Sequence, residues 1–394
     1  MRQRVEFWSS VELGSFLRGL VRELRAAGID ATHRFEVSDS AYRGAAGLAA
    51  RAHLRWRTYV SYPRHLYESL RTERAGGVAV VCTNTFYAPA VAIRAARNQG
   101  LRVVNWVFDL FPDVLVEGGR LRAGGACDVG LGRLARSTFG QADANIFLGE
   151  RLHRHATQRY GEIPRAAVIP IGADGEDFRA AAPQARPAGR PVRILYCGNL
   201  GRMHDIRTLA TWLGASAPSG WTMSFRGHGA GFRHLASALP EPHPGVIFGK
   251  SLPHSEWKEE MQAADVALVT MKLGAEGLVM PSKTYSAMVA GQAILAVCPR
   301  ESDLADTVLR HDAGWVVEPG DVQALRAVVA SLVAQPDELL QKRRRSFAAG
   351  HQQYDQAVLA RDHWAALLAQ LDPSGPRPAV APLRPPLPST RGRR

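Results

Sequence analysis

The chain has 394 residues, with 49 Lys and Arg against 36 Asp and Glu and a formal net charge of +13. This length suffices for two domains with separate cores. It holds no run of about 18 apolar residues, so we expect no transmembrane helix, and its N-terminus lacks the apolar segment of a secretory signal. The cysteines lie too far apart for a disulfide framework or a zinc site, so we expect a reduced, cytoplasmic protein; they are Cys82, Cys127, Cys197 and Cys298.

The charge is placed unevenly along the chain. Residues 1–170 carry +9, residues 171–371 carry zero, and residues 372–394 carry +4. A basic first half indicates contact with something anionic, and nucleic acid, a membrane surface and a phosphorylated acceptor all fit. An Arg-rich coding bias is the alternative.

The first elements read as strand, turn and helix. A strand is expected at Val5–Trp8, a turn at Glu12–Ser15 and a helix from about Phe16 to Ala27. This is how a Rossmann-like half begins, but with one glycine, Gly14, the phosphate signal of the turn is weak. Gly14 allows close approach of a ligand or simply makes the turn.

Residues 42–74 mix Arg with Trp and Tyr at helical spacing. Such a segment lies on a membrane interface or grips an anionic acceptor. The alternative is a solvated helix whose aromatic side chains turn to the core.

Two carboxylates follow a buried strand in the first half. Strands are expected at residues 78–82 and 101–107, and Asp109 and Asp113 come directly after the second one. Side chains at the carboxyl end of a parallel strand are well placed to face a cleft between domains. Asp109 is the better functional candidate, since Asp113 is as well suited to capping the turn.

A linker separates the two expected domains. A further strand is expected at 144–148, and residues 168–172 close the first half, with the first domain ending at residue 178. Residues 179–191 form an Ala/Pro/Arg/Gly linker. The second domain covers 192–340. Residues 341–371 are expected as helices that cross back to the first domain, and 372–394, with seven prolines, as a disordered basic tail.

The second domain again opens with strand, glycine loop and helix. The strand at 192–197 leads into Gly198–Asp205, which contains Arg202 and His204, and a helix follows from Ile206. Glycines let backbone N–H groups approach a phosphate, and Arg202 could neutralise it. The later Gly227–Phe232 is not a dinucleotide fingerprint, because its last position is Phe.

The most informative stretch is Glu276–Gly291. A Pro-Ser-Lys loop, residues 281–283, follows the expected strand 263–269 and leads into a short helix before the apolar run 293–297. Helix starts suit anions, and ligands of open α/β sheets bind at the carboxyl ends of strands. We interpret this stretch as a nucleotide-sugar site.

These motifs resemble glycosyltransferase family 4, the retaining GT-B enzymes, and within it bacterial polysaccharide-type transferases that often move N-acetylhexosamines. The matching segments are Trp106–Pro112 (W-V-x-D-L-F-P), Gly198–Asp205 (G-N-L-G-R-x-H-D), Ala264–Val266, and Glu276–Lys283 with Ala290–Gly291 (E-G-L-V-x-P-S-K…A-G). The similarity covers roughly residues 100–371 and is most specific from 194 to 297.

The resemblance implies an α/β protein with two Rossmann-like domains facing across a cleft, the second holding the donor. Lys283 and the first glycine loop would hold the diphosphate, Lys250–Leu252 would flank the base, and Glu276–Ser282 would contact the sugar. The expected donor-binding residues are Gly198, Asn199, Gly201, Arg202, His204, Arg226, Lys250, Leu252, Glu276, Met280, Pro281, Ser282 and Lys283. The expected catalytic residues are Asp109, Lys283, Arg202 and Glu276, and the acceptor-side residues are Glu12, Gly14, Asp109 and Asp113.

The chain departs from the family pattern in two motifs. The family has two glutamates with seven residues between them, and these align with Leu278 and Ser286. Glu276 would substitute for the first, and the second, usually a ribose contact, is missing. The family's Arg and Lys of the first glycine loop align with Asn199 and His204, which leaves Arg202 and Lys283 to supply the positive charge.

We therefore expect a retaining, metal-independent hexosyltransferase with no cofactor, because no Asp-x-Asp motif lies in a plausible loop. The expected donor is a UDP-sugar, best UDP-N-acetylglucosamine or another amino sugar. The expected acceptor is an anionic or lipid-linked saccharide at the inner membrane face, in surface polysaccharide synthesis, with the enzyme peripheral on that face. The alternatives are a small-molecule acceptor in antibiotic biosynthesis, a sugar-nucleotide epimerase, and a non-catalytic nucleic-acid-binding protein.

Overall fold

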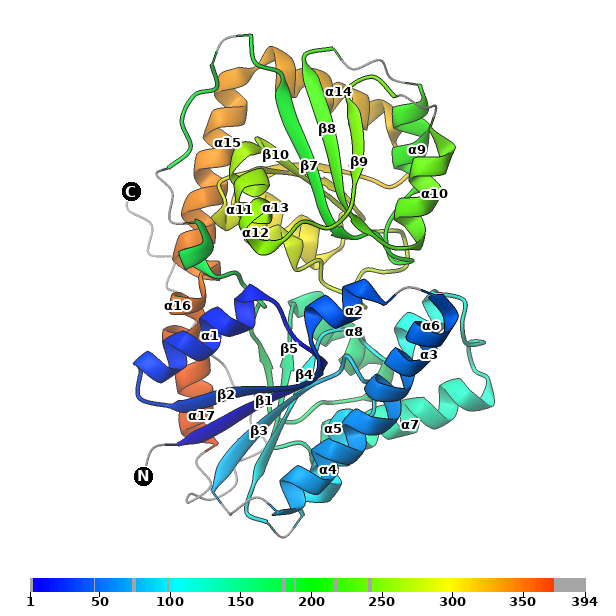
Figure 1. The fold of residues 1–394 in the computed structure, drawn as a ribbon, viewed down its shortest axis with the longest axis vertical. Coiled ribbons are helices and arrows are strands. Elements are labelled where there is room, and N and C mark those ends of the chain that lie inside the picture. The colour runs from blue at the N-terminus through cyan, green and yellow to red at the C-terminus, as the bar shows by residue number, and fades with distance from the viewer. Residues whose placement is uncertain are drawn as a thin grey trace. The chain divides into compact units, whose positions relative to one another are not determined.

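The computed structural model describes residues 3–45, 47–72, 76–97, 99–178, 182–187, 189–215, 219–239 and 243–371. The chain divides into two compact units (Figure 1), one made of Met1–Pro170 with Gln356–Arg394 and the other of Ile171–Asp355. Each unit is an α/β domain around a six-stranded parallel sheet. The predicted disordered tail, 372–394, lies outside the described residues.

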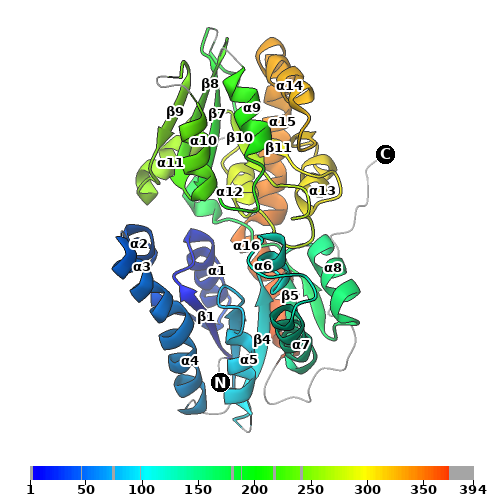
Figure 2. The same cartoon turned by 90° about the vertical axis from the view of Figure 1, so that its right-hand side faces the viewer.

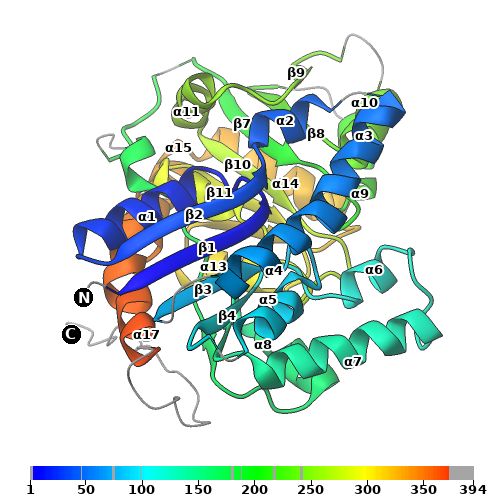
Figure 3. The same cartoon turned by 60° about the horizontal axis from the view of Figure 1, so that its bottom comes forward.

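The first sheet has the strand order β2-β1-β3-β4-β5-β6. Its strands are β1 (Arg4–Val11), β2 (Asp30–Val37), β3 (Gly77–Cys82), β4 (Arg102–Val107), β5 (Ala144–Phe147) and β6 (Ala166–Val168). β3, β4 and β5 are buried along their whole length, as expected of parallel strands covered on both faces. Figure 3 shows β2, β1 and β3 side by side, with α1 (Ser15–Ala26) running along them.

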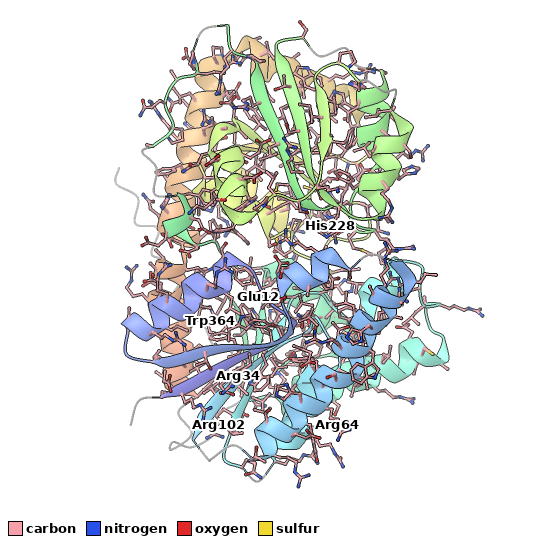
Figure 4. The ribbon with its side chains drawn as sticks, viewed as in Figure 1. Glu12, Arg34, Arg64, Arg102, His228 and Trp364 are labelled. Carbon is pink, nitrogen blue, oxygen red and sulfur yellow. The ribbon has the colours of Figure 1, made fainter. Side chains whose placement is uncertain are left out.

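Helices cover both faces of this sheet because successive side chains of a strand point to opposite sides. On β1, Trp8 packs with buried residues of the helices that follow β2 and β3. Phe7 points the other way and meets the ring of Trp364 edge to face, with 5.3 Å between ring centres; Trp364 is labelled in Figure 4. The helices of this unit are α1, α2 (Asp39–Gly44), α3 (Gly47–Trp56), η1 (Arg57–Ser61), α4 (Tyr62–Thr72), α5 (Ala88–Ala96), α6 (Asp113–Glu117), α7 (Ala126–Gln141), α8 (Glu150–Tyr160), α16 (Gln356–Leu359), η4 (Ala360–Trp364) and α17 (Ala365–Gln370).

The second sheet has the strand order β12-β11-β10-β7-β8-β9. Its strands are β7 (Val192–Asn199), β8 (Trp221–His228), β9 (Val246–Gly249), β10 (Val266–Thr270), β11 (Ala293–Val297) and β12 (Gly314–Val317). Counted from its own first strand, this is the order 3-2-1-4-5-6 of the doubly wound dinucleotide-binding fold.

One large apolar cluster joins this sheet to the helices on one face. Trp212 and Leu235 lie in it, fully buried, from α9 (Arg207–Gly214) and α10 (Ala230–Ala238), and Figure 2 shows these two helices in front of the strands. The other helices of this unit are η2 (Gly175–Phe178), α11 (His254–Ala263), α12 (Lys283–Val289), α13 (Asp303–Arg310), α14 (Val322–Ala334), α15 (Pro336–Ala349) and η3 (Gly350–Tyr354).

The units divide at slightly different points from those expected from the sequence. The first unit ends at Pro170 rather than at residue 178, and the chain returns to it at Gln356 rather than at residue 341. Residues of η2 pack on the second unit, where Phe178 lies 5.1 Å from Trp257 between ring centres. The returning segment is the one that carries Trp364 onto the first sheet.

Several elements have no counterpart in the sequence analysis, among them β2 and α10. β2 reads DATHRFEV and is largely exposed, so it lacks the apolar run that reveals a buried strand. α10 follows a glycine-rich loop that was interpreted only as a failed fingerprint. None of the helices in the described ranges is both long and apolar enough to cross a membrane.

Candidate active site

The second sheet changes direction of winding between β7 and β10, which are neighbours in the sheet but not in the chain. At such a point the loops that leave the two strands diverge, and ligands of open α/β sheets bind between them. The glycine loop 198–206 begins with the last two residues of β7, and the loop after β10 is residues 271–282, directly before Lys283. Both motifs singled out in the sequence therefore meet at one edge of the sheet.

Lys283 links these two loops. Its Nζ donates a hydrogen bond of 3.0 Å to Tyr196 Oη and lies 4.7 Å from the centre of the tyrosine ring. Tyr196 Oη in turn donates to the carbonyl of Asn199, at 2.8 Å. A Cβ at Gly198, whose φ is +129°, would come within 3.4 Å of Lys283 Cε. The ammonium group is thus held beside the backbone of the glycine loop.

The surroundings shift the pKa values of both basic groups near this loop. Burial lowers the pKa of Lys283 to about 8, because the charged form loses hydration. Burial and the neighbouring Lys283 lower the pKa of His204 to about 3. His204 is therefore neutral at pH 7, and its Nδ1 donates to the carbonyl of Thr270 at 2.6 Å.

Thr270, the last residue of β10, fastens the glycine loop to that strand. Its hydroxyl accepts from the backbone N–H of Asp205 at 3.1 Å and donates to the Asp205 carbonyl at 3.1 Å. The Asp205 carboxylate accepts from the backbone N–H and the hydroxyl of Thr208, in the first turn of α9. The loop is therefore held at both ends, with Gly201 and the exposed Arg202 between them.

Gly227, in β8, and Gly229, directly after it, allow this part of the chain to pack closely against the glycine loop. A Cβ at Gly227 would lie 1.9 Å from the Gly198 carbonyl oxygen, and one at Gly229 would lie 2.5 Å from Asn199 Oδ1. Only a residue without a side chain fits at these distances. These glycines bring the backbones of β7 and β8 together, which explains a glycine-rich sequence that is not a phosphate fingerprint.

The ends of β8 and β9 supply the outer part of this edge. Arg226 pairs with Glu260 at 3.4 Å and packs over Gly249, where a Cβ would clash with its guanidinium. His228, at the carboxyl end of β8 (Figure 4), bonds through Nδ1 to Ser251 Oγ at 3.1 Å. The expected base contacts are next to it: Lys250 is exposed and Leu252 is half-buried.

The loop after β10 carries a carboxylate with an unsatisfied hydrogen-bond acceptor. Glu276 is half-buried, and its Oε2 is inaccessible to solvent and has no hydrogen-bond partner among the described residues. Buried carboxylate oxygens are almost always paired, so this atom is suited to a donor group from outside the chain. The neighbouring apolar side chains of Leu278 and Met280 are buried.

Pro281 is also buried, whereas Ser282 is exposed and precedes α12 without capping it. α12 has seven residues, fewer than two turns, so its dipole is small. The ammonium group of Lys283, more than the start of the helix, is the positive feature of this loop.

The first sheet has its own point of reversal, between β1 and β3. The turn after β1 contains Glu12, whose Oε2 accepts from the Asp39 N–H at 3.2 Å and which lies 3.6 Å from Arg18. Gly14 precedes α1, and a Cβ there would meet no atom within 4 Å. The space beside Gly14 is therefore open, and protein packing does not require a glycine.

Asp109 follows β4 at the same edge and lines a largely apolar pocket. The pocket is lined by Thr83, Phe86, Asn105, Val107, Asp109, Leu110, Phe111, Pro112, Leu131, Leu134, Ala135, Thr138 and Phe139. Asp109 reaches solvent, yet the protein around it limits its hydration and raises its pKa to about 6. Asn105 Oδ1, in the pocket wall, is buried and has no hydrogen-bond partner among the described residues.

Asp113 has a structural environment. It is buried, and its carboxylate accepts from Tyr160 Oη and lies 3.2 Å from His155 Nε2 and from Arg159 Nε, all on α8. These contacts occupy both oxygens. Asp109 therefore remains the candidate of the pair, as the sequence analysis preferred.

We expect Asp113→Ala to lower the free energy of unfolding by about 2 kcal/mol, because it leaves the buried Tyr160 hydroxyl without its carboxylate acceptor. His155 and Arg159 add little, since both are half-exposed and Arg159 keeps Asp128 as a partner. Urea denaturation measures the change. Asp109→Ala is the control and should stay within about 0.5 kcal/mol of wild type; equal losses for both variants would contradict the structural role of Asp113.

Asp265, in the segment Ala264–Val266, lies at the opposite, amino-terminal end of β10. Its carboxylate bonds to Arg190 at 2.6 Å, to Arg343 at 3.0 Å and to the Arg193 N–H at 3.0 Å. It thereby ties residue 190 of the linker and helix α15 to the sheet. The segment Ala264–Val266 therefore stabilises the fold, and we assign it no contact with the ligand.

Sequence reasoning missed three residues of these sites. Tyr196 and Thr270 sit inside strands and look like ordinary strand residues, and Asn105 is one polar residue within an apolar strand. Tyr196, three residues before Asn199, belongs to no motif that the sequence analysis identified. Only the polar Asn105 in a buried run was a signal that could have been followed.

No protein-family model matches this chain. It is 28% identical over 238 residues to the probable glycosyltransferase WbjE of Pseudomonas aeruginosa, a match that covers 58% of this chain and 59% of WbjE. The matched region is thus less than two thirds of that relative.

Solved structures share the whole architecture. Sucrose-phosphate synthase from Thermosynechococcus elongatus superposes with a TM-score of 0.66 at 16% identity, over 94% of this chain and 99% of that one. HepE of Anabaena, in complex with UDP and glucose, gives a TM-score of 0.67 at 14% identity, over 93% and 100%. At these identities the likeness is one of fold, and the fold is the two-domain α/β architecture of GT-B glycosyltransferases.

Proposed function

We propose that this protein is a retaining, metal-independent glycosyltransferase. It moves a sugar, best N-acetylglucosamine or another amino sugar, from a UDP-sugar to a lipid-linked saccharide acceptor in surface polysaccharide synthesis. The observation that carries the proposal is the position of Lys283 beside Gly198 and Tyr196, at the winding reversal of the second sheet. The similarity to WbjE and the UDP bound by HepE support the same reading.

In the proposed reaction, the bond between sugar C1 and the diphosphate oxygen breaks and negative charge grows on the departing UDP. Fixed positive groups stabilise that charge most when they are already in place. Lys283 and Arg202 supply the charge. Gly201 would add a backbone N–H donor, whereas the Leu200 N–H already donates to the His228 carbonyl. Glu276 would accept a hydrogen bond from a sugar hydroxyl at its unpaired Oε2.

The acceptor hydroxyl attacks C1 on the face that the UDP leaves, so the configuration is retained. Its proton passes to an oxygen of the departing diphosphate, and the products are the extended saccharide and UDP. Asp109 would orient the acceptor hydroxyl or stabilise the positive sugar carbon. Glu12 and Gly14, at the first sheet's reversal, would lie on the acceptor side.

Product analysis tests the proposal. The protein is incubated with a panel of UDP-sugars, including UDP-glucose, and with either a lipid-diphosphate-linked saccharide or small-molecule acceptors. Mass spectrometry should show one added hexosamine on the lipid-linked acceptor, with UDP released. Transfer only to small molecules would overturn the acceptor, a changed sugar nucleotide without acceptor would indicate an epimerase, and no uptake of any nucleoside diphosphate would overturn the whole proposal.

We expect the affinity for UDP to decrease as the pH rises through about 8, where Lys283 loses its proton. A group that is charged only below its pKa attracts the diphosphate only there, so the loss approaches about tenfold per pH unit above this value. The phosphate of UDP itself titrates near pH 6, below this range. Isothermal titration calorimetry across the range measures the effect.

Lys283→Arg is the control for this pH dependence, because a guanidinium stays charged throughout. Its affinity should not change between neutral and alkaline pH, whatever its absolute value. A flat wild-type curve, or the same slope in Lys283→Arg, would show that another group titrates.

A further inference from the structure

The helix α3 of the first unit exposes apolar and basic side chains together. We define the α3 surface as Tyr42, Leu48, Arg51, Arg55, Trp56, Tyr59 and Val60, all of them exposed. Leu48 has 87% of its surface in solvent and Trp56 has 54%. Together with the other exposed apolar side chains of this surface, Leu48 and Trp56 form a patch of the kind that marks an interaction site.

No residue of α3 is buried. Within the described part of the chain, α3 has extensive contact only with η1, the turn that continues it. By contrast, the next helix α4 turns Tyr62, Leu66 and Leu70 into the core. The alternative of a core-facing helix therefore holds for α4 and fails for α3, and Figure 2 shows α3 continuing away from α4 along this side of the unit.

The patch is positively charged without compensation. The sequence holds no acidic residue between Asp39 and Glu68. Three arginines of this stretch are already paired: Arg43 with Asp39, Arg57 with Glu36 and Arg64 with Glu68 (Arg64 is labelled in Figure 4). The side chains of Arg51 and Arg55 have no ion pair or hydrogen bond with another described residue, so their charge is available to a partner.

The spacing places these groups along one stripe. Leu48, Arg51 and Arg55 recur at three and four residues, and Trp56 and Tyr59 continue the same side of the helix. Trp and Tyr prefer the boundary between water and hydrocarbon, and arginines beside them are attracted to anionic headgroups. We infer that the α3 surface docks on a bilayer that contains anionic phospholipid, with the helix lying in the plane of the headgroups.

Other occupants fit less well. A second copy would bring the same uncompensated arginines face to face across a two-fold contact, which is repulsive. A nucleic acid would pair with Arg51 and Arg55 but would leave Leu48 and Val60 without an apolar counterpart.

The inference goes beyond the proposed reaction. The α3 surface shares no residue with the donor site, and vesicle binding is measured without donor or acceptor. Failure of membrane docking would therefore leave the transferase proposal standing, and failure of sugar transfer would leave the docking surface standing.

Cosedimentation with vesicles tests the inference on the full chain. The vesicles contain phosphatidylcholine alone, or two parts phosphatidylcholine to one part phosphatidylglycerol. Wild type should bind the anionic vesicles much more tightly than the neutral ones, and binding should weaken as salt is raised. Arg51→Gln with Arg55→Gln should weaken binding about thirtyfold, the fold-change that corresponds to about 1 kcal/mol for each arginine near the surface.

Leu48→Ser with Arg51→Gln removes one apolar and one charged contact, and should also weaken binding at least tenfold. The matched control is Leu309→Ser with Arg310→Gln on α13, another exposed Leu–Arg pair, which should bind as wild type. Since α3 has no buried residue, thermal unfolding of all variants should be unchanged. Equal binding to both vesicles, equal loss in the control, or a wild-type dimer that Leu48→Ser disrupts in light scattering would each overturn the inference.

Discussion

Lys283→Met is expected to lower kcat for sugar transfer by at least about a hundredfold. Removing one preorganised group that stabilises charge in a transition state commonly costs about 2.7–4 kcal/mol of barrier. Lys283 is placed for this role, because its ammonium stands beside Gly198 and is oriented by Tyr196 at 3.0 Å. Methionine keeps the length and apolar character of the side chain, so the variant isolates the charge.

The matched control for this variant is Lys258→Met. Lys258 lies on α11, and its half-buried side chain is 3.6 Å from Asp177. Its loss should leave kcat within about twofold, because neither Lys258 nor Asp177 belongs to a motif loop. Lys283→Met should also bind UDP more weakly than wild type in calorimetry, whereas Lys258→Met should not. Turnover of Lys283→Met within threefold of wild type would remove Lys283 from the mechanism.

Asp109→Asn is expected to lower turnover by about 10²–10⁴, the range for a positioned acid–base group. Asparagine keeps the shape and loses the negative charge that would orient the acceptor hydroxyl or stabilise the sugar cation. The affinity for UDP should stay within about threefold, because the donor-binding loops belong to the second sheet. Steady-state kinetics with the acceptor, beside calorimetry with UDP, separate the two effects.

A pH profile gives the second readout for Asp109. Its pKa is raised to about 6, so activity that needs the carboxylate is absent below this value and develops as the pH rises through it. Asp109→Asn should lose this acidic limb, and Asp109→Glu should keep it at reduced activity. An unchanged acidic limb in Asp109→Asn would assign it to another group.

The sequence predicted the strands that are short, apolar and continuous. The strands expected at 78–82, 101–107 and 144–148 agree with the structure to within one residue at each end, because a buried parallel strand is recognisable from its continuous apolar run. β2 escaped notice, since an edge strand with one exposed face can be polar. The returning helices at 356–370 were foreseen in direction, but the point of return at Gln356 depends on packing.

The donor-site loops show both what the sequence could predict and what it could not. That Gly198–Asp205 and Glu276–Lys283 belong together was inferred from their spacing relative to strands. That His204 is neutral was not foreseen, because its pKa depends on burial and on Lys283, far away in the chain. The family's Ala264–Val266 motif likewise needed the structure to be recognised as an ion-pair anchor.

Local pattern by itself determined the α/β class, the two domains and the two loops that follow β7 and β10, since periodicity and glycine placement act within a few residues. Only the tertiary structure decided that these two strands are neighbours, that Tyr196 holds Lys283, and that α3, among the described residues, has extensive contact only with η1. These outcomes depend on strand order and burial, which arise from contacts between residues distant in the chain.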